Sequence, residues 1–375
     1  MKKIEFFRHN IDKKDIARCN KVFNSIFLTT GYAVEQFETR LADYLGAGET
    51  VGVTSCTAAL HLSLLAWGIK DGDEVITTPM SFCATSNAIL HSGAKPVFID
   101  VEEKTGNINA DIIEKSITKK TKAIMPVHLY GQMCDMKKIR KIADKYNLVI
   151  IEDAAHCLEG ARDGVRVAEL GDAACFSFYA TKSITSGEGG AIALNDRKKA
   201  GLLKMLRLHG IDKGAIDRYT KKYRYWDMRV LGWKYNMDNI QASLLIGQLE
   251  RVSDLWKRRN EICMRYQNAF QDAKGLNVME IVPNSKHGWH LYTIHVSPKK
   301  RNAILFSLQK KGIGVAVNYR AIHLLKYYRQ EFGYKRGDFP IAEKIGDSTI
   351  SIPLYPRLTD NEVKRVIDAV TKSEI

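Results

Sequence analysis

The sequence has few of the features that mark secreted, membrane-spanning or metal-binding proteins. Its 375 residues include seven cysteines, which form no CxxC pair and no spacing typical of a metal site. An odd, scattered set of cysteines indicates reduced thiols. The opening stretch MKKIEFFRHNIDKKD becomes charged too soon for a signal peptide, and no apolar run approaches the length of a membrane span. We therefore expect a soluble cytoplasmic protein with no metal site.

Two common glycine-rich nucleotide-binding patterns are also missing. The glycine group GEGG at 187–190 matches neither the P-loop pattern nor the dinucleotide fingerprint. By itself it indicates a sharp turn rather than a phosphate-binding loop.

Charge of one sign is in excess, with a formal net charge of +15. The lysines are spread along the chain, which favours a solvated basic surface over a site for a polyanion. One basic stretch interleaved with aromatics, residues 221–235, superficially suits single-stranded nucleic acid. Nothing around it resembles a nucleic-acid-binding module, so we predict an irregular loop and no nucleic-acid partner.

A regular alternation of strand-like and helix-like segments begins near residue 50. Helical patterns separate apolar runs that are mostly unbroken, which indicates a mostly parallel sheet with helices on both faces. Two more short strands complete this sheet in the predicted α/β fold. The expected strands are 51–54, 74–78, 95–100, 122–127, 148–153, 174–178 and 190–194.

A second, smaller unit follows. A long helical pattern over 238–273 leads out of the large unit, and the remainder shows mixed strand and helix patterns. We predict a large domain over 1–250 and a small C-terminal α/β domain over 251–375. The expected elements of the small domain are strand-like 292–296, 314–319 and 348–352, and helical 302–311 and 360–372.

The stretch FSFYATKSITSGEGG places Lys182 between an apolar run and a glycine-rich loop. A lysine held there can lose proton affinity through desolvation, which makes its amine a nucleophile. The alternative is an ordinary lysine in a surface loop.

Other polar residues fall where predicted strands end, which is where open α/β sheets bind ligands. Thr57 and its neighbours at 54–56 start a helix, and their N–H groups suit either a phosphate or a plain N-cap. Asp153 suits either a cationic ring nitrogen or a turn cap. Ser177 faces either a ligand or a neighbouring backbone, and Phe82 either stacks on a ring or packs in the core.

Taken together, these features suit pyridoxal 5′-phosphate. This cofactor requires a nucleophilic lysine, a phosphate site at a helix start and a carboxylate for its pyridinium nitrogen. Lys182, Thr57 and Asp153 meet these requirements in that order.

The chain resembles the DegT/DnrJ/EryC1/StrS sugar aminotransferases, which have the fold-type I (aspartate aminotransferase-like) architecture. The pieces that carry the resemblance run in the family's order from about residue 27 to the C-terminus. They are LTTGYAVEQFE, SCTAALHLSLLAWGI, GDEVITTPMSFCATSNAILHSGAKPVFIDV, IIEDAAH, FSFYATKSITSGEGG, LRLHGI and GWKYNMDNIQA.

The resemblance implies a role for each site residue. Lys182 binds the cofactor covalently, and Asp153 pairs with its ring nitrogen. His156 stands beside the ring hydroxyl, where relatives frequently have glutamine. The remaining residues implied are Cys56, Thr57 and Ser177 at the phosphate, Phe82 on the ring, Asn236 at the phosphate of the other subunit, and Thr29, Gly31 and His323 on the substrate side.

The resemblance also implies a homodimer with shared active sites, acting on L-glutamate and a nucleotide-linked keto sugar. The segment GWKYNMDNIQA looks most like members that act at C4, and C3 stays open. Alternatives are amination of a keto-inositol and a regulatory protein that binds the cofactor without turnover. A related branch with histidine in place of the lysine dehydrates its substrate, and the presence of Lys182 argues against that branch.

Overall fold

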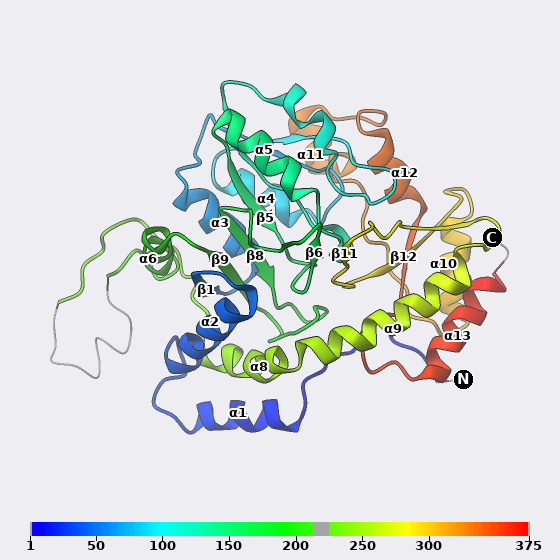
Figure 1. Cartoon of the computed structure of the whole chain (residues 1–375), viewed down its shortest axis with the longest axis horizontal. Helices are drawn as coiled ribbons and strands as arrows, with labels where there is room; N and C mark the ends of the chain where they lie inside the picture. Colours follow the sequence, from blue (N-terminus) through cyan, green and yellow to red (C-terminus); the bar gives the residue numbers. More distant parts are fainter. Residues whose placement is uncertain (1, 213–224, 374–375) are drawn as a thin grey trace.

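The computed structural model describes residues 2–212 and 225–373 (Figure 1). Of the stretch expected to be an irregular loop, residues 221–224 lie outside the described residues. Residues 225–235 contain only isolated β-bridges and bends, so that part of the prediction is confirmed.

A seven-stranded sheet forms the centre of the larger part of the chain. Six strands run in one direction, and only β9 is antiparallel to its two neighbours, β1 and β8. The mostly parallel sheet was predicted. The order is β1 (Glu49–Val53), β9 (Gly190–Leu194), β8 (Ala173–Ser177), β5 (Val149–Asp153), β4 (Thr121–Ile124), β2 (Glu74–Thr77) and β3 (Lys95–Phe98).

Helices cover both faces of this sheet, as Figure 1 shows. Successive residues of β5 illustrate the consequence: Ile150 and Ile151 are both fully buried, but each belongs to a different apolar core. Burial on both faces explains the unbroken apolar runs in the sequence. One core includes α2 (Tyr32–Leu45), α5 (Met136–Tyr146) and α8 (Asn239–Glu250); the other includes α3 (Cys56–Ala66), α4 (Ala84–His91) and α6 (Arg197–Leu206).

The long helical pattern over 238–273 is two helices rather than one. The first is α8, and α9 (Val252–Phe270) follows after Arg251, whose backbone is not helical. The helix-like stretch 109–117, which lies between two of the expected strands, forms the 3₁₀ helix η1 (Ala110–Ser116).

The C-terminal part has its own apolar core around a sheet of β10 (Leu276–Val278), β12 (Tyr292–Val296) and β13 (Thr349–Ile352). The strand expected at 314–319 is absent: a single bridge joins Ala316 to Ser351. The helices here are α10 (Arg301–Lys310), η3 (Ile322–Leu324), α11 (Lys326–Phe332), α12 (Pro340–Ser348) and α13 (Asp360–Thr371).

Two connections cross the predicted domain boundary. Ile4 belongs to the C-terminal core and bridges to Ile313. A third small sheet joins β6 (Ala161–Arg162) and β7 (Val165–Arg166) to β11 (Ser285–Lys286). The chain thus starts in the small unit before α1 (Lys13–Phe23), and the division at residue 250 stays a prediction.

Three further observations concern the described residues. Their helices include none that is both long and apolar enough to cross a membrane. No group of three potential metal ligands comes together among them. All seven cysteines lie in the described ranges and are free thiols.

Candidate active site

A cavity of about 540 Å³ lies at the carboxyl ends of the parallel strands. Its size is typical of a small-molecule site. It brings together most of the residues that the sequence singled out. These are Cys56, Thr57, Phe82, Asp153, His156, Ser177 and Lys182.

The topology explains why these residues meet. Asp153 is the last residue of β5 and Ser177 the last of β8, and these two strands are parallel neighbours. Carboxyl ends of parallel strands share one edge of a sheet. The start of α3, which follows β1, reaches the same edge.

Lys182 lies on the cavity wall, with its Nζ 3.3 Å from Nε2 of His290. Burial lowers the pKa of Lys182 to about 8, and the nearby Cys56 and Asp153 only partly oppose this shift. A substantial share of a lysine with this pKa is neutral near physiological pH, so its amine is available as a nucleophile and base. The prediction of a desolvated lysine agrees with this environment.

Asp153 is buried, and burial raises its pKa. Two hydrogen bonds oppose that rise by stabilising the carboxylate: Thr85 Oγ1 donates to Oδ2 at 2.7 Å, and the N–H of Ala155 donates to Oδ1 at 3.2 Å. A buried carboxylate is costly without a positive partner. A pyridinium nitrogen in the cavity would supply that partner.

His156 is held in one tautomer. Its Nδ1 accepts from the N–H of Tyr130 at 3.2 Å, so the proton resides on Nε2, which lies 3.1 Å from the hydroxyl of Tyr319. Burial, with a smaller effect of Lys182, lowers the pKa of His156 well below its ordinary value. A neutral ring that donates one hydrogen bond therefore faces the cavity.

The start of α3 fits a phosphate group. Ser55 is the N-cap, with its Oγ accepting from the N–H of Ala58 at 3.1 Å. The first N–H groups of a helix lack partners within the helix, and they attract anions. Gly190 of β9 allows the backbone to approach closely here, because a Cβ on it would lie 2.4 Å from the carbonyl carbon of Ser55.

Three more of the predicted residues line the cavity. Phe82 is 57% exposed, so its ring is free to stack on a ligand. Cys56 is buried, and burial raises its thiol pKa well above the ordinary value. Ser177 Oγ accepts from the N–H of Tyr179 at 3.4 Å.

Sequence reasoning missed His290, Tyr319 and Thr85, which all line the cavity. His290 and Tyr319 come from the C-terminal part of the chain, more than 100 residues beyond Lys182. Tyr319 is the last residue of the strand expected at 314–319, so the strand-end pattern could have indicated it, whereas His290 precedes the expected strand 292–296 and follows no strand end. Thr85 lies one turn beyond Phe82 at the start of α4. The strand-end pattern indicates its hydrogen-bond partner Asp153 but gives no signal for Thr85 itself.

Three predicted residues lie together but do not line this cavity. Asn236 Nδ2 donates to Thr30 Oγ1 at 2.7 Å, between Thr29 and Gly31. At Gly31, a Cβ would lie 2.8 Å from Nδ2 of Asn239. We call residues 27–31 and 236–239 the Asn236 cluster. The roles of Thr29, Gly31 and Asn236 stay predictions.

His323 is placed differently from the substrate-side position expected for it. It is fully buried, and its Nε2 lies 3.0 Å from a carboxylate oxygen of Glu343. It is not among the residues that line the cavity. A side chain without exposed surface cannot touch a substrate in this conformation, so we do not propose His323 as a substrate contact.

Comparison with known proteins gives this geometry its context. Residues 9–371 match the DegT/DnrJ/EryC1/StrS aminotransferase family. The chain belongs to that family. It is 42% identical over 366 residues to the spore coat polysaccharide biosynthesis protein SpsC of Bacillus subtilis, covering 96% of this chain and 94% of that protein.

Two further relatives agree. The UDP-4-amino-4-deoxy-L-arabinose–oxoglutarate aminotransferase of Shewanella sediminis is 34% identical, covering 97% of this chain and 96% of that protein. A putative sugar aminotransferase of Streptococcus pneumoniae, solved in its PMP form, superimposes with a TM-score of 0.92 at 30% identity over 98% of both chains. The family member described here is therefore an aminotransferase that acts on sugars, with the fold-type I architecture.

Pyridoxal phosphate is the cofactor of this family member, since the Streptococcus protein is solved in both PLP and PMP forms. The cavity fits it. The N–H groups at the start of α3 suit its phosphate, the buried Asp153 suits its ring nitrogen, and Lys182 lies on the same wall with a lowered pKa. The resemblance inferred from the sequence is confirmed.

Proposed function

We propose that this protein transfers an amino group from L-glutamate to the C4 keto group of a nucleotide-linked (UDP- or dTDP-) keto-deoxy sugar. The product would be an amino sugar for a surface glycan or a secondary metabolite. The observation that carries the aminotransferase chemistry is Lys182, desolvated beside Asp153 in one cavity. The name of the Shewanella relative, an aminotransferase of a UDP-4-amino sugar, supports C4 and the glutamate–oxoglutarate pair.

Lys182 and Asp153 are the catalytic residues in this proposal. Bound pyridoxal phosphate supplies an electron sink for the carbanion that forms at the donor carbon. With the cofactor bound, Lys182 would act as the base that removes the proton from the donor Cα and then as the acid that returns it. Asp153 would keep the ring nitrogen protonated, and the hydrogen bond from Thr85 favours the ionised form of Asp153 against the effect of burial.

The remaining cavity residues position the cofactor. Thr57 and Cys56 contribute backbone N–H groups at the phosphate, together with the Ser177 hydroxyl. Phe82 stacks on the ring, and His156 donates from Nε2 toward the ring hydroxyl side. Their convergence on one cavity supports these assignments.

We also propose a homodimer in which the Asn236 cluster completes the partner's site, with Asn236 at the phosphate and Thr29 and Gly31 near the substrate. In support, the cluster carries polar groups outside its own chain's cavity, and apolar side chains around it are exposed. Ile26 is 90% exposed, Leu28 45% and Tyr32 48%, which is typical of a surface that another protein covers. We place the enzyme in the cytoplasm.

The decisive experiment incubates the cofactor-loaded protein and L-glutamate with a panel of keto sugar nucleotides. The panel includes C3 and C4 ketones on UDP and dTDP, a keto-inositol, and a control without sugar. Formation of 2-oxoglutarate and an amino sugar with a C4 ketone supports the proposal. Turnover of only the keto-inositol would overturn it, and absence of any half-reaction with glutamate would favour the regulatory alternative.

A further inference from the structure

A second, much smaller cavity adjoins the cofactor cavity. It measures about 20 Å³, room for one or two water-sized groups. Lys182 and His290 line both cavities, so the two meet at the reactive lysine. Its other lining residues include Arg8, Asn10, Arg259 and Tyr355.

Two of its lining residues carry buried polar atoms without a hydrogen-bond partner in the described structure. Nη1 of Arg259 is one, although Arg259 itself is only 2% exposed. The hydroxyl of Tyr355, which is 3% exposed, is the other. Buried polar groups are nearly always paired, so an unpaired donor that lines a cavity points to a missing partner.

The charge around this cavity favours an anion. Arg259 is already paired with Glu159 through Nη2, which offsets one positive charge. Arg8 adds a second guanidinium. Burial raises the pKa of Tyr355 to about 12, and the positive charge of Arg8 partly opposes this rise. The tyrosine therefore stays a neutral donor. Two guanidinium groups and a phenol hydroxyl are donors suited to a carboxylate.

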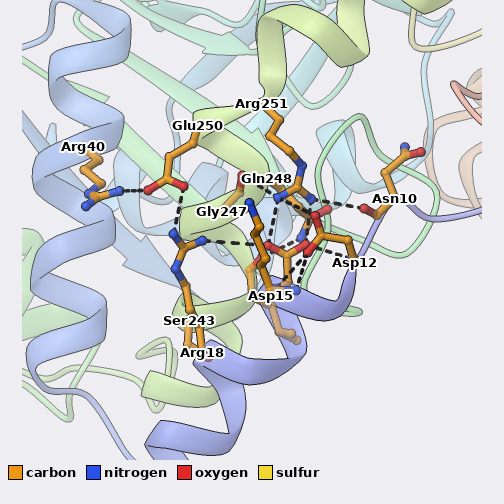
Figure 2. Close-up of polar contacts among 12 residues, drawn as sticks. Asn10, Asp12, Asp15, Arg18, Arg40, Ser243, Gly247, Gln248, Glu250 and Arg251 are labelled. Atoms are coloured by element: carbon orange, nitrogen blue, oxygen red, sulfur yellow. Dashed lines mark hydrogen bonds and ion pairs between the residues drawn. The ribbon is translucent and has the colours of Figure 1, made fainter.

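The segment that carries Arg8 is anchored at both ends. Ile4 pairs with the backbone of residues 312–314. At the other end Arg251, at the break between α8 and α9, donates to the carbonyl of Asn10 at 3.3 Å and to the buried Asp15 at 2.7 Å. Figure 2 shows this network, in which Arg251 also pairs with Asp12. Anchoring lowers the entropy cost of presenting Arg8 to a ligand.

We propose that the small cavity binds the α-carboxylate of the amino-acid donor, with Arg8, Arg259 and Tyr355 as hydrogen-bond donors. The α-carboxylate is one bond from the Cα at which Lys182 acts, and the cavity adjoins Lys182. It is too small for a sugar, and the phosphate position at Cys56 and Thr57 lines only the larger cavity. The inference rests on the proposed function for the identity of the donor.

The binding of a dicarboxylate that cannot react tests the small cavity independently of catalysis. Glutarate, a dicarboxylate with no reactive amine or ketone, is titrated into the cofactor-loaded protein by calorimetry. We expect Arg8→Gln and Tyr355→Phe each to raise the Kd about tenfold, because a hydrogen bond to a charged group contributes on this scale. Tyr355→Phe removes a hydroxyl that makes no hydrogen bond among the residues the structure describes. Lys13→Gln, which removes an exposed charge from α1, is the matched control and should leave the Kd unchanged.

Half-reactions then identify which carboxylate is bound. The cofactor spectrum reports the reaction of L-glutamate and of L-alanine, which has only the α-carboxylate. Equal losses for both amino acids in Arg8→Gln and Tyr355→Phe support the assignment. A loss confined to L-glutamate would overturn it in favour of the side-chain carboxylate.

The remaining outcomes separate this inference from the proposed function. Wild-type protein that binds glutarate and reacts with L-glutamate, while both variants behave like Lys13→Gln, would overturn the inference alone. Wild-type protein that does neither would overturn the proposed donor and the inference with it.

Discussion

The family resemblance predicted functional roles for both the cavity around Lys182 and the Asn236 cluster. The two regions differ in how their polar groups are paired. The cavity gathers a desolvated lysine, a buried carboxylate and a helix start around open space. In the Asn236 cluster the polar groups satisfy one another: Asn236 donates to Thr30, and Asn239 accepts from the backbone N–H groups of Ala33 and Val34. Desolvated titratable groups therefore concentrate in the cavity, where chemistry needs them. Asn236 and Asn239 are buried within the cluster, and the exposed side chains near it include the apolar Ile26, Leu28 and Tyr32.

The sharpest test of this contrast is Lys182→Ala. We expect transamination to fall by at least about 10³-fold, because the variant loses both its nucleophile and its general base. Cofactor binding should persist without covalent attachment. Borohydride reduction followed by peptide mapping should find the cofactor on Lys182 in the wild type. An adduct on another lysine would contradict the assignment of the cavity.

Asp153→Asn should slow the proton-transfer step by about 10²-fold, since an amide cannot stabilise a protonated ring nitrogen and preorganised charge contributes on this scale. The amide can still accept from Thr85, so circular dichroism should report an unchanged fold. Rapid-mixing spectroscopy with L-glutamate measures the step. Near-normal rates with an unchanged cofactor spectrum would show that Asp153 only caps a turn and does not act on the cofactor.

Asn236→Ala tests whether the cluster serves a partner chain. We expect cofactor affinity to fall by about 10- to 100-fold, because one charge-assisted hydrogen bond to the phosphate is lost. Equilibrium dialysis of the cofactor measures this change. Thr29→Ala, on the same surface but without a phosphate role, is the control and should bind the cofactor normally.

Mixed dimers decide which chain Asn236 serves. A dimer of one Lys182→Ala chain and one Asn236→Ala chain would contain one site with both residues intact and one with neither. Activity approaching half that of the wild type per mixed dimer supports the shared site. If mass spectrometry confirms the mixed dimers and no activity returns, Asn236 acts within its own chain.

The smallest expected effect is the pH dependence of cofactor uptake by cofactor-free protein. Only the neutral amine of Lys182 attacks the aldehyde, and its pKa is lowered to about 8. The uptake rate should therefore rise about tenfold between about pH 7 and pH 9 and then level off. An ordinary exposed lysine would give a continuing rise toward pH 10. A continuing rise in stopped-flow absorbance would show that the cavity does not desolvate Lys182.

Much of the cavity lining could be predicted from the sequence because several of its residues stand at the ends of predicted strands. The run LVIIED ends at Asp153 and the run before Lys182 ends at Ser177, and parallel strands bring such ends to one edge. The break at Arg251 was not predicted. Helical periodicity continues across it, and at the break Arg251 contacts Asn10, Asp12 and Asp15, which are far away in the sequence.

Local patterns along the chain predicted the fold class, because it depends on residue type at short spacing along strands and loops. Together with the family resemblance, they predicted the cofactor and Lys182 as the lysine that binds it. Long-range packing decided the surroundings of Lys182. His290, Tyr319 and Arg259 reach it from beyond residue 250, and Arg8 reaches it from the first residues of the chain. Desolvation and unpaired donors are properties of those surroundings, since they arise only when distant segments exclude water from the same space.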